Sequence, residues 1–368
     1  MRPTLIEVNL NYLKHNLDLI RSHTSNTKIM AVVKSNAYGH GLLEVARFLE
    51  FLKVHSLGVA LLEEGIFLRK NGINLPIVVF GGIIHEQINQ FLDWNLEFFV
   101  SSKDVLEKIE KISKAKTKTA IIHLKIDTGM GRIGEIASKS EKFIEEAVKK
   151  ENIKIKGVCS HLACADDPKN PMTINQVKSF LSAISVFKKL GVEMPLRHIA
   201  NSGGTLYFPE THLDIIRPGI LLYGVYPESK SPKVLDVIPV LNLKSKISFH
   251  KSIPKGFKVS YGSTWISQNE SEISTIPLGY GDGYRRHLSN RGEVLIGGKR
   301  RPIVGRICMD QFMVRNEMNG YRLNEEVVLI GQQGGKSIKV EEISDWADTI
   351  PYEILTSLNE RIPRVFIS

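Results

Sequence analysis

The chain has 368 residues, of which 42% are hydrophobic and 24% are charged. This composition is typical of a globular protein, and the length exceeds what one hydrophobic core usually supports, so we expect two domains. The formal net charge of +10 would suit a nucleic-acid binder, but the basic residues are interleaved with acidic ones on predicted helical faces, as in residues 138–150. They do not cluster with aromatic side chains, so the charge is best explained as solvated surface.

The first strong element is a short apolar run at residues 29–33, followed by Lys34 and by a turn containing Gly39 and Gly41. This pattern predicts a buried strand that ends at Lys34, a turn and then a helix, which is a βα unit of a parallel sheet. Such folds place their chemistry at the carboxyl ends of the strands. A lysine desolvated there has a lowered pKa and can form an imine with an aldehyde. The alternative is an ordinary surface lysine at a strand end.

Between about residues 25 and 225, β-rich runs alternate with amphipathic segments. The predicted strands are residues 29–33, 57–60, 77–80, 96–100, 121–126, 155–159, 197–200 and a last one from 214 towards 223. The predicted helices are residues 42–51, 63–70, 86–94, 104–112, 138–149 and 173–190. Strands that alternate with helices in this way predict an α/β fold, specifically a (β/α)₈ barrel of the TIM type. A doubly wound sheet is the alternative, but it favours a Gly-x-Gly-x-x-Gly fingerprint after the first strand, which residues 34–39 do not supply.

The pattern changes from about residue 240. Strand-like runs follow one another, separated by glycine, asparagine and proline, at residues 241–249, 272–278, 293–296 and 326–330. This is typical of an all-β domain. We therefore predict a barrel domain at residues 1–238, whose first few residues are free to pack on the β domain, and a mostly-β domain at residues 239–368. The proline-containing stretch at residues 226–239 would connect the two.

The compartment can also be predicted from the sequence. Residues 1–13 contain no apolar core of signal-peptide length, and no apolar run approaches the length of a membrane span. Three cysteines in a chain of this size argue against a disulfide framework. We expect a cytosolic protein.

The residues that follow the predicted barrel strands are rich in chemical groups. They are Lys34, residues 125–132, Ser160 with His161, residues 201–204 and residues 217–220. All of them would converge on one mouth of the barrel. Glycines in the last two segments would let backbone N–H groups approach a phosphate closely. A lysine able to form an imine beside a phosphate site indicates pyridoxal 5′-phosphate (PLP).

The segment Ala31-Val-Val-Lys-Ser-Asn-Ala-Tyr-Gly-His-Gly41 resembles the PLP-attachment motif of the alanine racemases, fold-type III PLP enzymes built from an α/β barrel and a C-terminal β domain. The resemblance continues in family order over nearly the whole chain, at residues 123–134, 160–161, 217–220, 259–265, 279–283, 304–311 and 351–353. It implies a homodimeric isomerase that interconverts L- and D-alanine and supplies D-alanine for peptidoglycan. The alternatives are a broad-specificity racemase or a decarboxylase of the same fold, or a non-catalytic PLP-binding barrel.

The resemblance also implies two catalytic bases. Lys34 would hold PLP and act at one face of the substrate Cα, and Tyr261 of the partner subunit would act at the other. Racemisation needs acid–base groups on both faces of a near-planar carbanion. An ordinary tyrosine, with a pKa of roughly 10, must be helped towards phenolate. His161, which would link Tyr261 to Arg217, is the helper that the family suggests; a histidine satisfied by core contacts is the alternative.

Arg217 would lie against the pyridine nitrogen of PLP. A guanidinium only donates hydrogen bonds, so the ring nitrogen would stay unprotonated and PLP would be a weaker electron sink, which suppresses side reactions such as transamination. An ordinary ion pair between Arg217 and a carboxylate is the alternative.

The remaining predicted contacts surround the cofactor and the substrate. The phosphate would be held by Asn201, Ser202, the backbone N–H groups of Gly219 and Ile220, and the hydroxyls of Tyr38 and Tyr352, although these tyrosines could also be core aromatics. Arg132 would bind the substrate carboxylate or the PLP phenolic oxygen, aided by the backbone N–H of Met309 of the partner subunit. Lys125 matches a position that is carbamylated in many relatives, where the new carboxylate orients the arginine.

A metal site is the last possibility to weigh. Cys159, His161 and Cys164 offer three ligands near one strand end, with no second pair at structural spacing, so we expect no metal. Cys164 also stands where many relatives have threonine, close to the predicted entry channel.

Overall fold

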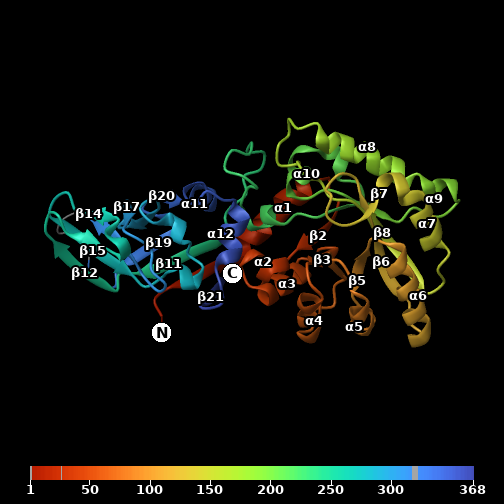
Figure 1. Cartoon of the computed structure of the whole chain (residues 1–368), viewed down its shortest axis with the longest axis horizontal. Helices are drawn as coiled ribbons and strands as arrows, with labels where there is room; N and C mark the ends of the chain where they lie inside the picture. Colours follow the sequence, from red (N-terminus) through yellow and green to blue (C-terminus); the bar gives the residue numbers. More distant parts are fainter. Residues whose placement is uncertain (1, 26, 317–321) are drawn as a thin grey trace.

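The computed structural model describes residues 2–25, 27–316 and 322–368. Two bodies lie end to end along the long axis of the molecule: a barrel surrounded by helices and a body dominated by antiparallel strands (Figure 1). In the described residues no helix is long and apolar enough to span a membrane.

The barrel strands pair in the order β10-β2-β3-β4-β5-β6-β8-β9, all in parallel. Their bounds are β2 (Lys28–Val32), β3 (Ser56–Val59), β4 (Ile77–Val79), β5 (Glu97–Val100), β6 (Ala120–Asp127), β8 (Ile153–Cys159), β9 (Leu196–His198) and β10 (Ile215–Ile216). Backbone hydrogen bonds from Asp214 to Arg197 (3.1 Å) and from Arg217 to Ala200 (3.0 Å) join β10 to β9. The predicted (β/α)₈ barrel is confirmed, with a short extra strand, β7 (Glu135–Ile136), beside β6.

Helices cover the outside of the barrel (Figure 1). They are α3 (Leu42–Phe51), α4 (Leu62–Lys70), α5 (Ile88–Asp93), α6 (Lys103–Lys116), α7 (Ser140–Val148), α8 (Met172–Ile184) and α9 (Val186–Lys189). The longer helices follow the amphipathic pattern; in α6, for example, Leu106 and Ile109 are buried while charged residues face outwards. Residues 173–190, predicted as one helix, are divided into α8 and α9 at Ser185.

The last predicted barrel strand is much shorter than expected. The apolar run from residue 214 towards residue 223 forms strand only at β10 and then turns at Pro218 and Gly219 into a 3₁₀ helix, η4 (Ile220–Tyr223). Every residue of η4 is buried. A continuously apolar run does not distinguish a buried strand from a buried helical turn, which is why the prediction extended too far.

The C-terminal body is a mostly antiparallel sheet in the order β12-β15-β18-β17-β16-β19-β11-β1-β21, in which β1 (Leu5–Asn9) and β21 pair in parallel, with β20 beside β19. Its strands are β11 (Leu241–Lys246), β12 (Phe249–Ile253), β15 (Ser271–Ile276), β16 (Glu293–Ile296), β17 (Lys299–Val304), β18 (Phe312–Asn316), β19 (Glu326–Gln333), β20 (Lys336–Ile338) and β21 (Arg364–Ile367). A separate hairpin joins β13 (Lys258–Val259) to β14 (Trp265–Ile266). Two helices, α11 (Val340–Trp346) and α12 (Pro351–Ser357), make this body mostly rather than wholly β.

The N-terminus connects the two bodies. Strand β1 (Leu5–Asn9) pairs with β11 and β21 of the C-terminal sheet, and α1 (Leu10–His23) then crosses to the barrel. On α1, the amide of buried Asn16 donates to the carbonyls of Leu222 (3.1 Å) and Ile238 (2.8 Å), and its oxygen accepts from the backbone N–H of Ile238 (2.8 Å). The boundary at residue 238 stays a prediction.

Candidate active site

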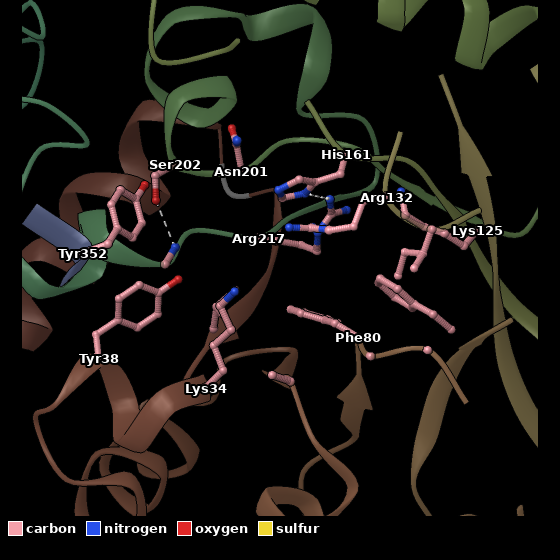
Figure 2. A pocket seen from close by; sticks show the side chains of 17 residues that line it. Lys34, Tyr38, Phe80, Lys125, Arg132, His161, Asn201, Ser202, Arg217 and Tyr352 are labelled. Atoms are coloured by element: carbon pink, nitrogen blue, oxygen red, sulfur yellow. Dashed lines mark hydrogen bonds between the residues drawn. The ribbon is translucent and has the colours of Figure 1, made fainter. Parts of the chain in front are cut away.

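A cavity of about 360 Å³ opens at the carboxyl ends of the barrel strands (Figure 2). This volume lies within the range of small-molecule sites. The predicted site residues that line it are Lys34, Tyr38, Lys125, Arg132, His161, Asn201, Ser202, Arg217, Gly219 and Tyr352. They come from widely separated parts of the sequence, so the barrel brings them together as the pattern of strand ends predicted.

Lys34 follows β2 and points into the cavity between Tyr38 and Phe80 (Figure 2). Burial, together with the nearby positive charge of Arg132, lowers the pKa of Lys34. A larger fraction of the amine is therefore neutral near pH 7 than in a surface lysine, which is the state needed to attack an aldehyde. The structure thus gives Lys34 an environment suited to imine formation.

Lys34 begins a turn of unusual hand, α2 (Lys34–Tyr38). The four residues from Ser35 to Tyr38 have φ between 52° and 56°, which places them in the left-handed region. For non-glycine residues this region costs roughly 1–2 kcal/mol each. Hydrogen bonds hold the turn in place: Ser35 N donates to Glu64 Oε1 (2.6 Å), and Leu42 N donates to Asn36 Oδ1 (2.7 Å). The turn brings both Lys34 and Tyr38 to the cavity.

The opposite wall forms a cradle of polar groups. Gly219 N donates to Ser202 Oγ at 3.0 Å (Figure 2), and Leu221 N lies 3.4 Å from the same oxygen. Ser202 therefore accepts from the backbone and still has its own O–H to donate. A Cβ at Gly219 would lie only 2.3 Å from Tyr38 Oη, so this approach requires glycine. Ile220, the other predicted backbone donor, follows Gly219 at the start of η4 and its side chain is fully buried.

Tyr38 and Tyr352 complete the cradle. Their ring centroids are 6.0 Å apart, and Figure 2 shows both beside Ser202. Burial raises the pKa of both phenols, so they remain protonated donors. Asn201 shapes the same corner, because its Oδ1 accepts from Gly204 N (2.9 Å) at the start of α10 (Ser202–Tyr207). Several donors thus face one place, as a phosphate requires.

Arg217 lies deep in the cavity next to His161. Its Nη2 donates to the carbonyls of Ser160 (2.8 Å) and Ile199 (3.1 Å) and lies 3.3 Å from His161 Nδ1 (Figure 2). Burial lowers the pKa of Arg217 to about 10, so it remains a cation at neutral pH. Within the described residues no carboxylate forms an ion pair with Arg217, unlike the alternative weighed from sequence.

His161 is held in one tautomer by this contact. Because a guanidinium has no acceptor, His161 Nδ1 must accept and its proton must lie on Nε2. Burial, with the charge of Arg217, lowers the pKa of His161 well below its usual value. The imidazole is therefore neutral, with an N–H that is available to another polar group.

Lys125 and Arg132 lie on the side of the cavity formed by β6. Lys125 is only 3% exposed, and burial lowers its pKa to about 8. The turn that carries Arg132 is shaped by Asp127, whose Oδ1 accepts backbone N–H groups of residues 129–131 at 2.9–3.2 Å. A lysine with this pKa is partly neutral near pH 7, which is the form that reacts with CO₂.

Two predicted residues lie away from the cavity of their own chain. Tyr261 is 71% exposed in η5 (Tyr261–Ser263), and Met309 is 54% exposed. The β13–β14 hairpin that flanks Tyr261 is at the far end of the molecule from β2 (Figure 1). In a single chain, neither Tyr261 nor Met309 lines the cavity that holds Lys34.

Some cavity residues were not predicted. Phe80 and Phe99 form an aromatic wall, with stacked rings whose centroids are 4.9 Å apart. Phe80 directly follows β4. The rule that residues just after a barrel strand face the site, which identified Lys34, would also have identified Phe80 if it had been applied to apolar residues. The cysteines of the segment weighed as a metal site are separated: Cys159 is buried inside the barrel, whereas Cys164 Sγ lies 3.7 Å from Met172 Sδ. The described residues contain no cluster of three metal-ligating side chains.

Comparisons with known proteins agree with this geometry. The family model for the alanine racemase N-terminal domain matches residues 8–227, and that for the C-terminal domain matches residues 240–366. An alanine racemase of Carboxydothermus hydrogenoformans is 42% identical over 100% of both chains. The structure of an alanine racemase of Clostridium difficile 630 has a TM-score of 0.94 at 36% identity, covering 100% of this chain and 96% of that one. An alanine racemase of Bartonella henselae, solved with covalently bound pyridoxal phosphate, has a TM-score of 0.90 at 28% identity and covers 100% of both chains.

Proposed function

The chain belongs to the alanine racemase family, and on this premise we propose that it interconverts L- and D-alanine with PLP held on Lys34. One observation carries the proposal: a single cavity holds the partly desolvated amine of Lys34, the buried cation of Arg217 and the cradle made by Ser202 and Gly219. An amine, a cation and an anion cradle match the aldehyde, ring nitrogen and phosphate of PLP.

The residues around the cavity can hold the cofactor along its length. Ser202, the backbone N–H of Ile220, Tyr38 and Tyr352 would donate to the phosphate, and the N–H of Gly219 would turn from Ser202 Oγ to the phosphate, with Asn201 shaping that corner. When bound, PLP provides an electron sink that stabilises negative charge at the substrate Cα. Arg217 would face the ring nitrogen as a donor, supported by the carbonyls of Ser160 and Ile199, and would leave that nitrogen unprotonated.

Two bases would move the Cα proton from opposite faces. Lys34 is the base on the barrel side. Tyr261 of the partner subunit is proposed for the other side, because Tyr261 is exposed and does not line the cavity of its own chain. The N–H of His161 is placed to hydrogen-bond an incoming phenol oxygen. The active enzyme is then a homodimer with sites shared between subunits.

The substrate carboxylate would bind Arg132, with the backbone N–H of Met309 of the partner subunit beside it. Lys125, whose pKa burial lowers to about 8, would react with CO₂ to form a carbamate. That reaction replaces a buried cation with an anion that can hold the guanidinium of Arg132 in a fixed orientation. It also removes one of the positive charges near Arg217.

The biological role would be the supply of D-alanine for peptidoglycan. We place the enzyme in the cytoplasm, since all three cysteines are free, as is usual in a reducing compartment.

The test combines two measurements on the purified protein loaded with PLP. Borohydride reduction should fix the pyridoxyl group on the peptide that contains Lys34, and L-alanine in D₂O should racemise with deuterium at Cα. The Lys34→Ala variant should lose both. Label on another lysine, or CO₂ release in place of racemisation, would contradict the proposal.

A further inference from the structure

A chain of buried polar side chains, joined by hydrogen bonds, runs beneath the cavity through the barrel interior. We call this chain the file. TIM barrels normally have branched apolar residues in this interior. The file begins at Arg217 and continues through His198 on β9 and His123 on β6 to Glu97 on β5. All four are at most 5% exposed. The ring of Phe99, which lines the cavity, lies beside both histidines, at 6.2 Å from His123 and 6.0 Å from His198.

The barrel backbone leaves room for this file. Strand β8 lies between β6 and β9, and His123 must reach across it to meet His198. At the crossing point β8 has Gly157, where a Cβ would lie 2.2 Å from His123 Nδ1. Any other residue at position 157 would displace the histidine, so the sequence of β8 accommodates the file.

The hydrogen bonds of the file can run in only one direction. Arg217 Nη1 lies 2.7 Å from His198 Nδ1, and because arginine only donates, this nitrogen must accept. His198 then has its proton on Nε2, which donates to His123 Nδ1 at 2.8 Å. His123 in turn has its proton on Nε2, which donates to Glu97 Oε2 at 3.0 Å. Donors and acceptors match at every step.

The charge states agree with this direction. Burial lowers the pKa of both His123 and His198, so both are neutral. Desolvation alone would raise the pKa of Glu97, but hydrogen bonds from His123 and Lys156 and the charge of Lys156 lower it, and Glu97 is a carboxylate. Lys156 Nζ bonds the second oxygen, Oε1. The file thus has a cation that only donates at one end and an anion that only accepts at the other.

We propose that Glu97 is a positioning residue for Arg217. Arg217 sets the direction of the file, and Glu97 supports that direction by accepting from His123 Nε2, so that a lone pair of His198 faces the guanidinium and holds it at the cavity. Without an acceptor at position 97, the Nε2–H of His123 loses this partner, and Arg217 loses part of its support. The inference rests on the proposed function in one respect, that Arg217 faces the cofactor ring nitrogen.

The first test reads the proton positions directly. In PLP-loaded protein with ¹⁵N-labelled histidine, the resonances of His123 and His198 should both report the Nε2–H tautomer. In Glu97→Gln, the ¹⁵N signals of His198 should shift although it does not contact residue 97, since a neutral amide polarises the file less. The control variant is Glu146→Gln, which removes a carboxylate that pairs with Lys103 on the surface. In this control the ¹⁵N signals of His198 should not shift. An Nδ1–H tautomer in the wild type, or His198 signals that do not respond to Glu97→Gln, would overturn the proposal.

The second test separates positioning from stability. The double variant Glu97→Leu/His123→Phe replaces the lower half of the file by apolar side chains of similar size, an exchange that buried ionic groups often tolerate. We expect it to fold but to lose roughly 10-fold in kcat for L-alanine with little change in KM, because Arg132 still binds the substrate. A folded double variant with the kcat of the wild type would refute the role of Glu97. If the wild-type protein does not racemise alanine, the proposed function is refuted. The tautomers of His123 and His198 would still test the hydrogen-bond direction of the file.

Discussion

At the residue scale, two lysines share one cavity but have different surroundings. Lys34 has part of its side chain accessible and lies near Arg132 and Glu64, whereas Lys125 is 3% exposed. Burial is the main cause of the lowered pKa in both. The more accessible amine suits a large aldehyde, and the enclosed one suits a molecule as small as CO₂.

The pKa of Lys125 leads to a prediction about pH. Below about pH 8 the amine is mainly protonated and unreactive, and above it the amine is mainly neutral. At a fixed concentration of dissolved ¹³CO₂, the ¹³C carbamate signal should therefore grow as the pH rises from 6 to 9. The Lys125→Met variant is the control and should lack that signal. A signal of equal size in the control, or none at pH 9 in the wild type, would rule out carbamylation of Lys125.

The contact between Gly219 and Tyr38 leads to a second prediction. In Gly219→Ala the new methyl group would lie 2.3 Å from Tyr38 Oη and push the phenol away from the cradle. Loss of one charge-assisted hydrogen bond should weaken PLP binding about 10- to 100-fold, measured by titrating the apoprotein and following cofactor absorbance. Gly82→Ala is the control, since a Cβ there meets no atom within 4 Å. Equal PLP affinities in the two variants would argue against the cradle.

At the scale of elements, the most unusual feature is the left-handed turn α2. Gly39 and Gly41 predicted a turn from sequence, but nothing in Ser35-Asn-Ala-Tyr38 predicts four non-glycine residues with positive φ. The cost is offset by tertiary contacts: Glu64 holds Ser35 N, and the side chain of Asn36 holds Leu42 N. Tertiary contacts maintain a strained backbone directly next to Lys34. We infer that the turn is there to position Lys34 and Tyr38 at the cavity, since it lowers the stability of the fold.

The backbone strain can be tested at Ser35, whose side chain is exposed. Ser35→Gly removes the left-handed penalty and should raise the free energy of unfolding by about 0.5–1 kcal/mol, after allowing for the greater flexibility of glycine in the unfolded chain. Ser182→Gly, at an exposed site within α8, should lower it by about 0.5 kcal/mol. Urea denaturation at equal PLP saturation measures both. Destabilisation of the same size in the two variants would contradict the strain argument.

Much of the barrel could be predicted from sequence because its strands are short apolar runs and its helices are strongly amphipathic. The prediction missed β1 and α1, whose roles depend on distant partners: β1 completes the C-terminal sheet, and Asn16 of α1 bonds residues 222 and 238. It also missed α12, which carries Tyr352 to the cavity. The short elements β1 and α12 are defined by long-range packing, which local periodicity does not encode, whereas α1 buries Leu13, Leu17 and Ile20 at helical spacing and was overlooked although its pattern is local.

The site was predicted to a similar extent. Strand ends and motifs identified the polar groups of the cavity, because chemistry in a barrel concentrates at one mouth. They did not identify the aromatic wall of Phe80 and Phe99 or the file below Arg217. His123 and Glu97 lie within strands, and only the three-dimensional arrangement shows that they meet.

At the scale of the whole molecule, the proposed site would be divided between the two bodies in a way that one chain does not complete. The cavity is in the barrel, while Tyr261 and Met309 belong to the C-terminal body, are exposed and do not line the cavity. An antiparallel pair of chains related by a two-fold axis would place each C-terminal body beside the other barrel, and two-fold dimers are the commonest oligomers. The central claim is therefore that each active site combines Lys34 of one chain with Tyr261 of the other.

A mixed dimer tests this claim most directly. Lys34→Ala and Tyr261→Phe chains carrying different tags would be co-expressed, and the dimer bearing both tags would be purified and assayed for alanine racemisation. Each parent homodimer should keep less than about 1% of wild-type activity, since each lacks one base. If sites are shared, the mixed dimer contains one site with both native bases and one with neither, and should show about half the wild-type activity. If the mixed dimer is as inactive as its parents, Tyr261 does not act across the subunit interface and the account is contradicted.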